Sequence, residues 1–542
     1  MPTVRDAFFE VLRQLKLTTI FGNPGSTEES FLQDLPAGFR YVLALHEASV
    51  VAMADGYAQN TGEAVLVNLH TAAGIGNAMG NICTAWHNRT PMIILAGQQT
   101  RAMLLLEALL SNLQAVQLPK PYVKWSYETA RPADAPAALL RAWAAAVQPP
   151  AGPVFLSIPM DDFDGPAAGV PAARRVSRAL QASADDLRDT ADALIAASNP
   201  ILITGGALDQ GEGGWLDAVR LAEALGCPVL AAPMEGRPGF PETHPQYQGV
   251  APAAIGPLCE SLQGHDVALV VGAPVFRYYP YVAGDYLPPG MRLIQVSDDP
   301  EATARAPVGD SILADPARAC RVLADLVAQS GRAAVPPPAL KKAAPEPKPA
   351  PAAPAASDRI SADSLFHTLA GLRPADSIIV EESLSNLKAL RARLPTARPR
   401  SFFSASSGVL GYALPAAAGV ALAERDRGSG RKVICLLGDG AAQYTIQGLW
   451  NAARLRLPIL FVVLRNREYA ILKSFAEMEE TPAVPGLDLP GLDCVRLAEG
   501  YGCAAGRVDD PEALADALRD GLARAGPYLL EVAIDAEVPP LL

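Results

Sequence analysis

The chain has 542 residues, half of them apolar, and a formal net charge of −12. Because this length exceeds what one hydrophobic core usually supports, we expect roughly two to four domains. The acidic balance argues against nucleic acid or an anionic membrane as the main partner. No apolar run reaches the roughly 18 residues of a membrane span, and residues 1–16 lack the apolar block of a signal peptide.

Seven cysteines are scattered along the chain, an odd number without a C-x-x-C pair. This pattern is typical of reduced thiols, which most often fill apolar cores. We therefore expect a cytoplasmic protein.

Composition divides the chain into domains. Residues 333–356 are dominated by Pro, Ala and Lys without an apolar period, which favours an extended, solvated linker. A weaker break, rich in Gly, Pro, Ala and Arg, lies around residues 163–177. We therefore predict an N-terminal domain at 1–175, a central domain at 180–330, a linker at 331–357 and a C-terminal domain at 358–542.

Each predicted domain alternates short apolar runs with helical stretches, which is typical of an α/β fold with doubly wound parallel sheets. Three such domains of similar size are the expected architecture. In chain order the predicted strands are residues 19–21, 41–45, 64–69, 92–96 and 154–158, then 200–204, 228–232, 267–271 and 292–296, and finally 377–380, 433–437, 459–464 and 529–534.

Three polar residues of the first domain, Ser26, Glu47 and His70, each follow a predicted strand. Each has an ordinary explanation on its own: Ser26 could cap the next helix, Glu47 suits a first helical turn, and His70 could be a core or capping histidine. Together they would lie on one rim of a parallel sheet. That shared position favours a binding or catalytic site.

In the last domain an apolar run ends in Gly438-Asp439-Gly440, and the next apolar run ends at Asn466. A helix is expected between them, roughly from Tyr444 to Leu455. This strand–helix–strand unit would place Asp439 and Asn466 on neighbouring strand ends, where oxygen ligands suit a hard cation such as Mg2+. The glycines allow close approach of an anion. The unit therefore predicts a Mg2+–diphosphate clamp.

The sequence resembles thiamine-diphosphate-dependent enzymes of the pyruvate decarboxylase and acetolactate synthase type, and within them most closely the benzoylformate decarboxylase branch. The segments that carry the resemblance span the chain from about residue 20 to 500. They are residues 21–26, Glu47 with 54–58, 68–70, 96–99, 272–278, 411–415, the Gly438–Gly440 to Asn466 motif, and 484–488.

The resemblance implies three doubly wound domains that bind thiamine diphosphate and Mg2+. The implied reaction is the non-oxidative decarboxylation of a 2-oxo acid, with aromatic acids of the benzoylformate kind leading, to an aldehyde and CO2. The alternative is a carboligase, lyase or acetolactate-synthase-like enzyme that makes or cleaves 2-hydroxy ketones. Each active site in the family combines the first domain of one subunit with the last domain of another. A homodimer is thus the smallest expected unit and a homotetramer is usual.

For the first domain, the resemblance implies that Glu47 hydrogen-bonds the pyrimidine ring of the cofactor and so promotes its proton activation. Ser26 would hydrogen-bond the substrate carboxylate, and His70 would donate or accept a proton during turnover. Asn23 and Gly25 are implied to lie against the cofactor.

For the last domain, the resemblance implies a cation site and a cradle for the rest of the cofactor. The Gly408 carbonyl would contact the pyrimidine amino group, and Leu410 would hold the cofactor in its bent conformation. The implied Mg2+ ligands are Asp439, Asn466 and the backbone carbonyl of Glu468. The residues implied to line the diphosphate are Ser385, Gly438, Gly440, Ala441 and Tyr444.

The chain departs from the family pattern at several positions. The second active-site histidine of benzoylformate decarboxylases is absent, and Tyr279 stands nearby as a weaker candidate acid. Arg465 replaces the first Asn of the usual Asn-Asn pair. Leu384 and Ile471 are bulky residues at positions implied to lie near the substrate, which makes aliphatic or smaller 2-oxo acids plausible alternatives to aromatic ones.

Overall fold

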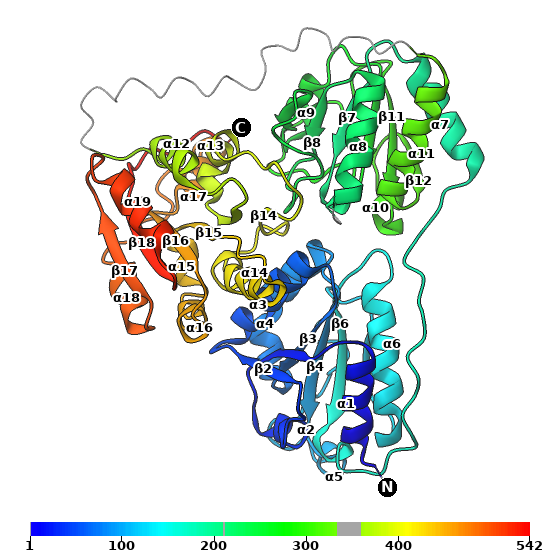
Figure 1. Cartoon of the computed structure of the whole chain (residues 1–542), viewed down its shortest axis with the longest axis vertical. Coiled ribbons are helices and arrows are strands. Elements are labelled where there is room, and N and C mark those ends of the chain that lie inside the picture. Colours follow the sequence, from blue (N-terminus) through cyan, green and yellow to red (C-terminus); the bar gives the residue numbers. More distant parts are fainter. Residues whose placement is uncertain (1, 210–211, 333–358, 542) are drawn as a thin grey trace.

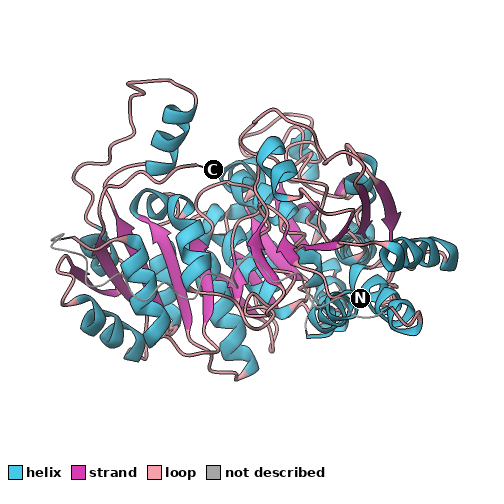
Figure 2. Ribbon diagram, turned by 90° about the horizontal axis from the view of Figure 1, so that it is seen from above, coloured by secondary structure: helices cyan, strands magenta, loops and turns pink. Residues whose placement is uncertain are grey.

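The computed structural model describes residues 2–209, 212–332 and 359–541. It contains three six-stranded sheets (Figure 1), and neighbouring strands pair in parallel in each of them. Helices lie on both sides of the strands (Figure 2). The predicted architecture of three doubly wound α/β units is therefore confirmed.

The first sheet has the strand order β2-β1-β3-β4-β6-β5. Its order reverses beside β1, and a doubly wound sheet opens its ligand crevice at such a reversal, beyond the carboxyl ends of the strands. The strands are β1 (Thr19–Gly22), β2 (Arg40–Leu43), β3 (Val65–Leu69), β4 (Met92–Gln98), β5 (Ser126–Glu128) and β6 (Val154–Pro159). The helices are α1 (Val4–Gln14), α2 (Glu29–Leu32), α3 (Glu47–Thr61), α4 (Thr71–His87), α5 (Arg101–Leu104) and α6 (Ala135–Val147).

The central sheet has the order β12-β11-β10-β7-β8-β9 and reverses beside β7. The strands are β7 (Ile201–Thr204), β8 (Val229–Ala231), β9 (Tyr247–Val250), β10 (Val267–Val271), β11 (Arg292–Ser297) and β12 (Asp310–Leu313). The helices are α7 (Ala184–Ala196), α8 (Glu212–Leu225), α9 (Ile255–Ser261), α10 (Pro300–Ala304) and α11 (Pro316–Gln329).

The third sheet has the order β14-β13-β15-β16-β18-β17 and reverses beside β13. The strands are β13 (Ile378–Glu382), β14 (Phe402–Phe403), β15 (Val433–Gly438), β16 (Ile459–Arg465), β17 (Ala504–Val508) and β18 (Tyr528–Ala533). The helices are α12 (Ala362–Leu372), α13 (Leu387–Arg393), α14 (Ala413–Arg427), α15 (Asp439–Gln443), α16 (Gly448–Leu455), α17 (Ala470–Met478), α18 (Cys494–Gly500) and α19 (Leu514–Ala523).

Five strands were not predicted from the sequence, namely β5, β9, β12, β14 and β17. All five lie at the edges of their sheets. An edge strand pairs on one side only and is covered less completely, so it does not need the continuous apolar run of a central strand. The residues of β12, for example, are partly or fully exposed.

The first and third sheets share one hydrophobic core, which runs from Phe21 through Tyr412 to Leu529. The helices α3 and α14 meet inside it, between the two sheets in Figure 1. Their backbones approach so closely that a Cβ atom at Gly419 would lie 1.9 Å from the Met53 carbonyl oxygen, and one at Gly56 would lie 2.3 Å from the carbonyl oxygen of Ala416. Only glycine fits at these two positions.

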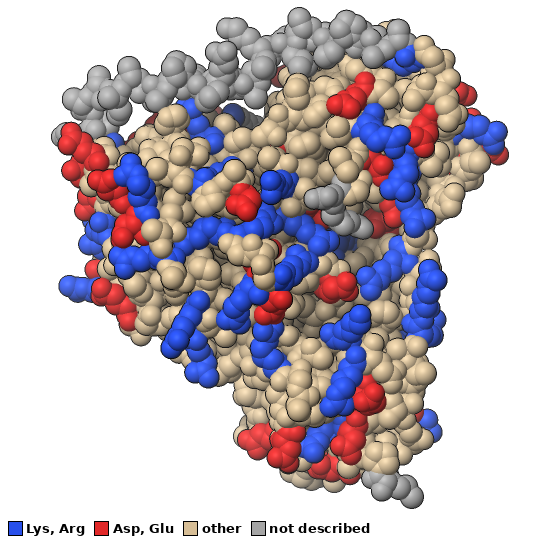
Figure 3. Space-filling view, in the orientation of Figure 1, with Lys and Arg blue, Asp and Glu red and all other residues tan. Residues whose placement is uncertain are grey.

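Two observations concern the outside of the molecule. Lys and Arg side chains gather across the middle of one face (Figure 3), although the net charge is −12. Among the described residues, no helix is both long and apolar enough to cross a membrane.

The predicted linker lies outside the described residues, apart from Gly331 and Arg332.

Candidate active site

The polar residues predicted on the first rim lie at the ends of neighbouring strands. Strands β2, β1 and β3 are adjacent and parallel. Ser26 follows β1 in the short 3-10 helix η1 (Ser26–Glu28), while Glu47 follows β2 and His70 follows β3. Since the carboxyl ends of parallel strands meet at one edge, the fold brings Ser26, Glu47 and His70 to the same edge of the first sheet.

Glu47 is the first residue of α3, as the sequence predicted. The helix is capped by His46, whose Nδ1 accepts the amide hydrogen of Ala48 at 3.1 Å. The Glu47 carboxylate is buried and accepts a hydrogen bond from Asn77 Nδ2 at 3.1 Å. A carboxylate has two oxygens, so Glu47 can take a further hydrogen bond from a ligand at the rim.

The expectation that Ser26 caps the following helix is wrong. Gly25 is the N-cap residue of η1, and its amide donates to Glu28 Oε2 at 2.9 Å. Ser26 is therefore the first residue of the 3-10 helix, and the Glu28 carboxylate accepts the amide hydrogen of the cap residue. Ser26 itself is exposed, so its hydroxyl is accessible to a ligand.

His70 is paired with a buried carboxylate. Its Nδ1 lies 2.9 Å from Glu28 Oε2 and 3.1 Å from Thr27 Oγ1. Glu28 is only 1% exposed, and its other oxygen accepts the amide hydrogen of Gly97 at 2.8 Å. A carboxylate beside Nδ1 favours the tautomer that carries its proton there, so Nε2 is the nitrogen that can exchange a proton with a ligand.

The backbone around this pair is tightly fixed. A Cβ atom at Gly25 would lie 2.2 Å from His70 Nδ1, so only glycine fits against the ring. Thr71, the next residue after His70, has a φ of +36°, which is unusual for a residue with a side chain. Such backbone strain is found most often at functional sites.

Glu28 is the residue of this site that the sequence analysis missed. Its one sequence signal is its position three residues after Gly25, which is the spacing of a helix capping box. That signal predicts a local hydrogen bond to the Gly25 amide but not the contact with His70. The contact depends on how β1 and β3 lie beside each other in the sheet.

The third sheet brings Asp439 and Asn466 together at the ends of adjacent parallel strands, β15 and β16. Asp439 accepts the amide hydrogen of Gly440 at 2.9 Å and that of Arg467 at 2.8 Å. Burial raises the pKa of Asp439 to about 6. Asn466 Oδ1 accepts the amide hydrogen of Glu468 at 3.2 Å, so the three predicted cation ligands form one turn around the strand ends.

These residues fit a hard cation. The described residues contain no group of three or more His, Cys, Asp or Glu side chains arranged to hold a metal. The predicted ligand set does not require one, because it consists of one carboxylate, one amide oxygen and one backbone carbonyl, all of them oxygens that Mg2+ accepts. Within the described part of the chain, the buried Glu468 Oε1 has no hydrogen-bond partner. A cation with its water ligands would satisfy such an atom.

The prediction of a helix over residues 444–455 is wrong for the first turn of that helix. The helical stretch begins at Asp439 as α15, stops at Gln443 and resumes at Gly448 as α16. The interruption contains Tyr444, which is exposed, and the buried, β-branched Thr445. A β-branched residue is less favourable in a helix. Tyr444 is thus the C-cap residue of α15 and lies next to the predicted diphosphate cradle.

The loop that carries Gly408 and Leu410 is held against this cradle. Glu382 is buried and accepts the backbone amide hydrogens of residues 411–413. Burial raises its pKa to about 8. A Cβ atom at Gly411 would lie 2.9 Å from the Cβ atom of Tyr444. Gly408 has a φ of +74°, a conformation that favours glycine.

The remaining predicted cradle residues lie on the same edge of the third sheet. Ser385 lies in the short 3-10 helix η5 (Leu384–Asn386), just after β13. Gly438 ends β15, the neighbour of β13, and Ala441 lies in α15. The predicted residues therefore form two groups, one on the first sheet and one on the third.

Tyr279 belongs to neither group, because it follows β10, a strand of the sheet in the central domain. It is 59% exposed, and its ring lies 4.9 Å from that of Phe475. Phe475 is on α17, the helix that also carries Ile471, and α17 contacts η5, which contains Leu384. The structure thus places Tyr279 beside the helix that carries Ile471, one of the two residues predicted to narrow the substrate pocket.

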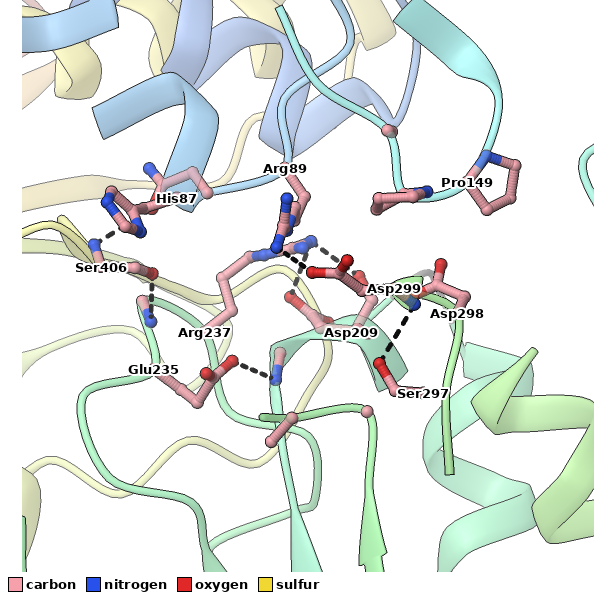
Figure 4. Close-up of a pocket in the computed structure, with 18 of the residues that line it drawn as sticks. His87, Arg89, Pro149, Asp209, Glu235, Arg237, Ser297, Asp298, Asp299 and Ser406 are labelled. Atoms are coloured by element: carbon pink, nitrogen blue, oxygen red, sulfur yellow. Dashed lines mark hydrogen bonds and ion pairs between the residues drawn. The ribbon is translucent and has the colours of Figure 1, made fainter. Parts of the chain in front are cut away.

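A cavity of about 360 Å3 lies between the first and central domains (Figure 4), and Arg400 and Ser406 of the third domain also line it. Arg89 and Arg237 face the carboxylates of Asp299 and Asp209 in it. Burial and the nearby arginines lower the pKa of His87 to about 4. None of the predicted catalytic or cofactor-binding residues is among the described residues that line this cavity, so it is separate from the site described above.

Models of known protein families show to which family this chain belongs. The family model for the N-terminal TPP binding domain of thiamine pyrophosphate enzymes matches residues 2–118, that for the central domain matches 187–323, and that for the C-terminal TPP binding domain matches 385–532. The chain belongs to the thiamine pyrophosphate enzyme family. The two TPP-binding matches contain both groups of predicted site residues, and the prediction of thiamine diphosphate as the cofactor is confirmed.

Relatives in this family resemble the chain over nearly its whole length. The benzoylformate decarboxylase of Pseudomonas aeruginosa is 45% identical over 98% of this chain and 99% of its own. The crystal structure of benzoylformate decarboxylase from Polynucleobacter necessarius is 44% identical, covers 100% of both chains and superposes with a TM-score of 0.94. The thiamine diphosphate-dependent 4-hydroxybenzoylformate decarboxylase of Rhodococcus jostii is 42% identical over 99% of both chains, with a TM-score of 0.93.

Proposed function

We propose that this protein is a thiamine-diphosphate- and Mg2+-dependent decarboxylase that converts an aromatic 2-oxo acid of the benzoylformate type to an aldehyde and CO2. The observation that carries the proposal is the rim of the first sheet, where Ser26, Glu47 and the Glu28–His70 pair lie together. These groups supply an anion contact, a carboxylate and a proton carrier. The names of the relatives support the same reaction and substrate class.

Each rim residue has a distinct task in this proposal. The exposed Ser26 hydroxyl donates a hydrogen bond to the substrate carboxylate. Glu47 accepts a hydrogen bond from the cofactor pyrimidine and so sets its protonation. His70 exchanges a proton with the substrate oxygen or carbon through Nε2, while Glu28 orients the imidazole through Nδ1.

The third sheet holds the other end of the cofactor. Asp439, Asn466 and the Glu468 carbonyl would bind Mg2+, and the glycine-flanked start of α15 would receive the diphosphate. Thiamine diphosphate, when bound, supplies the electron sink that takes up the electron pair released as the bond to CO2 breaks. The residues of the chain position the reactants and move protons.

The proposal includes a homodimer or a homotetramer in which each site combines two copies of the chain. The support is an exposed apolar segment that follows β4 in the first sheet. Within residues 101–113, Leu105 is 91% and Leu109 is 87% exposed, and Leu106 and Leu113 are also exposed. Apolar surface of this extent on one short segment is typical of a protein interface, and we assign it to a second copy of the chain.

A cytoplasmic location is part of the same proposal. All seven cysteines are free, and most of them are buried. Free thiols are typical of a reducing compartment.

The experiment is a substrate panel. The purified protein is incubated with thiamine diphosphate, Mg2+ and, separately, benzoylformate, 4-hydroxybenzoylformate and pyruvate, and both aldehyde and CO2 are measured. We expect aldehyde and CO2 in equal amounts, with the aromatic acids as the better substrates. A preference for pyruvate would instead assign the protein to small aliphatic 2-oxo acids, as the bulky Leu384 and Ile471 would favour. Absence of CO2 release from every acid would overturn the proposed function.

Carboligation is the second candidate, and it is favoured by one observation. The nearest candidate for the second proton donor is the exposed Tyr279, and a phenol is a weaker acid than an imidazolium ion. Slow protonation gives an aldehyde time to capture the reaction intermediate. Adding benzaldehyde to the benzoylformate assay distinguishes the two functions. If the amount of acyloin formed exceeds the amount of newly released aldehyde, ligation is favoured.

A further inference from the structure

A short antiparallel pair of segments lies beside the predicted cation ligands. After Arg467 the chain forms α17, continues through exposed residues 479–486 and then returns. The amide of Tyr469 donates to the Leu487 carbonyl at 2.8 Å, and the amide of Leu489 donates to the Arg467 carbonyl at 2.7 Å. We refer to residues 467–469 together with 487–489 as the clasp.

The clasp rests directly on the predicted diphosphate cradle. A Cβ atom at Gly440 would lie 2.5 Å from the ring of Tyr469 and 2.9 Å from the side chain of Leu489. The clasp is also joined to the cation site, because the amide of Arg467 donates to Asp439 Oδ2 at 2.8 Å. Arg467 has a φ of +64°, so the turn that makes this contact is held in an unusual conformation.

Lys473 connects the two segments of the clasp. It lies on α17, and its ammonium group pairs with the carboxylate of Glu468 in one segment and with Asp488 Oδ1, at 2.8 Å, in the other. The Glu468 side chain is 8% exposed, whereas the Asp488 side chain is 80% exposed. Charge-assisted hydrogen bonds of this kind are stronger than neutral ones, and the exposed one is weakened by salt.

We propose that Lys473 is a positioning residue of the cofactor site, which keeps the clasp closed over Gly440 and thereby slows the release of thiamine diphosphate. Opening the clasp would withdraw Tyr469 and Leu489 from Gly440 and loosen the turn that follows Asn466. The inference rests on the proposed placement of the diphosphate and Mg2+ at Gly440, Asp439 and Asn466.

The test measures cofactor release directly. Full-length protein loaded with thiamine diphosphate and Mg2+ is separated from free cofactor, and the cofactor released with time is quantified by thiochrome fluorescence. Lys473→Met should release it about tenfold faster, which corresponds to the loss of one good charge-assisted bond. Lys473→Arg should release it at nearly the wild-type rate. Lys16→Met, at an exposed lysine in the first domain, is the matched control and should behave as wild type.

Two further measurements separate positioning from a general loss of structure. Asp488→Asn changes an exposed side chain and should also speed release, and the double variant should be no faster than Lys473→Met, because both changes open the same clasp. Release from the wild type should accelerate with added NaCl, and release from Lys473→Met should respond much less.

Wild-type release rates in both Lys473→Met and Asp488→Asn, with normal cofactor binding, would overturn this inference and leave the proposed function intact. Additive effects in the double variant, or equal salt dependence in Lys473→Met and wild type, would also overturn it. Failure of the wild type to bind thiamine diphosphate would overturn the inference and the proposed function together.

Discussion

The Nδ1 atom of His70 lies 2.9 Å from a carboxylate oxygen of the buried Glu28, which comes from the turn after the neighbouring strand. The contact crosses from β3 to β1, so it depends on the parallel pairing of these strands. It fixes which ring nitrogen of His70 faces the open rim. Proton transfer at the proposed site therefore depends on a residue that has no need to touch the substrate.

The first prediction concerns this pair. Glu28→Gln removes the charge that favours a proton on Nδ1 of His70 while keeping the size of the side chain. We expect kcat/KM for the 2-oxo acid to fall by about a hundredfold, within the usual contribution of general acid–base catalysis. Steady-state kinetics check this, and Glu29→Gln at the exposed neighbouring residue is the control. An unchanged kcat/KM in a folded Glu28→Gln variant would remove Glu28 from the mechanism.

The second prediction concerns Glu47. In Glu47→Gln the carboxylate that we propose sets the protonation of the cofactor is lost, but the third-sheet cradle is untouched. The dissociation constant of thiamine diphosphate should stay within a few-fold of wild type, whereas turnover should fall by about two orders of magnitude or more. Calorimetry and steady-state assays measure the two quantities separately. Turnover at the wild-type rate would show that Glu47 does not have this role.

The third prediction concerns the contact between α3 and α14. An Ala in a helix is normally more stable than a Gly by about 0.5–1 kcal/mol, but at Gly419 the new methyl group would meet the Met53 carbonyl at 1.9 Å. Gly419→Ala should therefore lower the free energy of unfolding by about 1–3 kcal/mol. In Gly371→Ala on α12, where the new Cβ would meet nothing within 4 Å, stability should be unchanged or higher. Scanning calorimetry of both variants checks the contrast, which equal Tm values would contradict.

The fourth prediction is a pH dependence at the junction of the first and third sheets. Asp55 is buried there, accepts hydrogen bonds from Thr90 at 2.9 Å and Tyr412 at 3.2 Å, and burial raises its pKa to about 6. Because this pKa lies above the unfolded value of about 4, the folded state binds the proton more tightly. The resulting stability is fully present below about pH 4 and is lost as the pH rises through about 6.

Asp55→Asn cannot ionise, so its Tm relative to wild type should rise between about pH 4 and 7 and stay constant above that. The change should correspond to about 2–3 kcal/mol at most. Asp164→Asn, at an exposed aspartate, should show no such trend. A Tm difference between Asp55→Asn and wild type that does not vary with pH would contradict the assignment.

The sequence was sufficient to predict those strands whose residues are apolar in the sequence and buried in the structure. Central strands such as β15, which is buried up to Leu437, and β16, which is buried throughout, read as nearly continuous apolar runs. The polar groups that follow them, including Asp439 and Asn466, could be placed at one sheet edge because parallel strands end together. The edge strands lack that apolar signal, which explains why β5, β9, β12, β14 and β17 were not predicted.

The sequence could not predict contacts that depend on which distant segments of the chain pair with each other. The sequence shows only the capping spacing of Glu28, because its contact with His70 depends on the pairing of β1 with β3, between which α2, β2 and α3 lie along the chain. The return of residues 487–489 to Tyr469, and the seating of both on Gly440, depend in the same way on the path of a loop. Ser26 was misassigned as a cap, because the 3-10 helix begins at Ser26 itself and Gly25 is its N-cap residue.

The central claim is that one active site combines Glu47 of one copy of the chain with Asp439 of another. The most direct measurement co-expresses Glu47→Gln and Asp439→Ala in equal amounts and assays the mixed oligomers with thiamine diphosphate, Mg2+ and benzoylformate. Each variant alone should be nearly inactive. Half of the random dimers contain both variants, and one of their two sites then has both residues intact, so we expect about a quarter of the wild-type activity. Activity no higher than that of the separate variants, in mixtures shown to contain hybrid oligomers, would contradict the shared site.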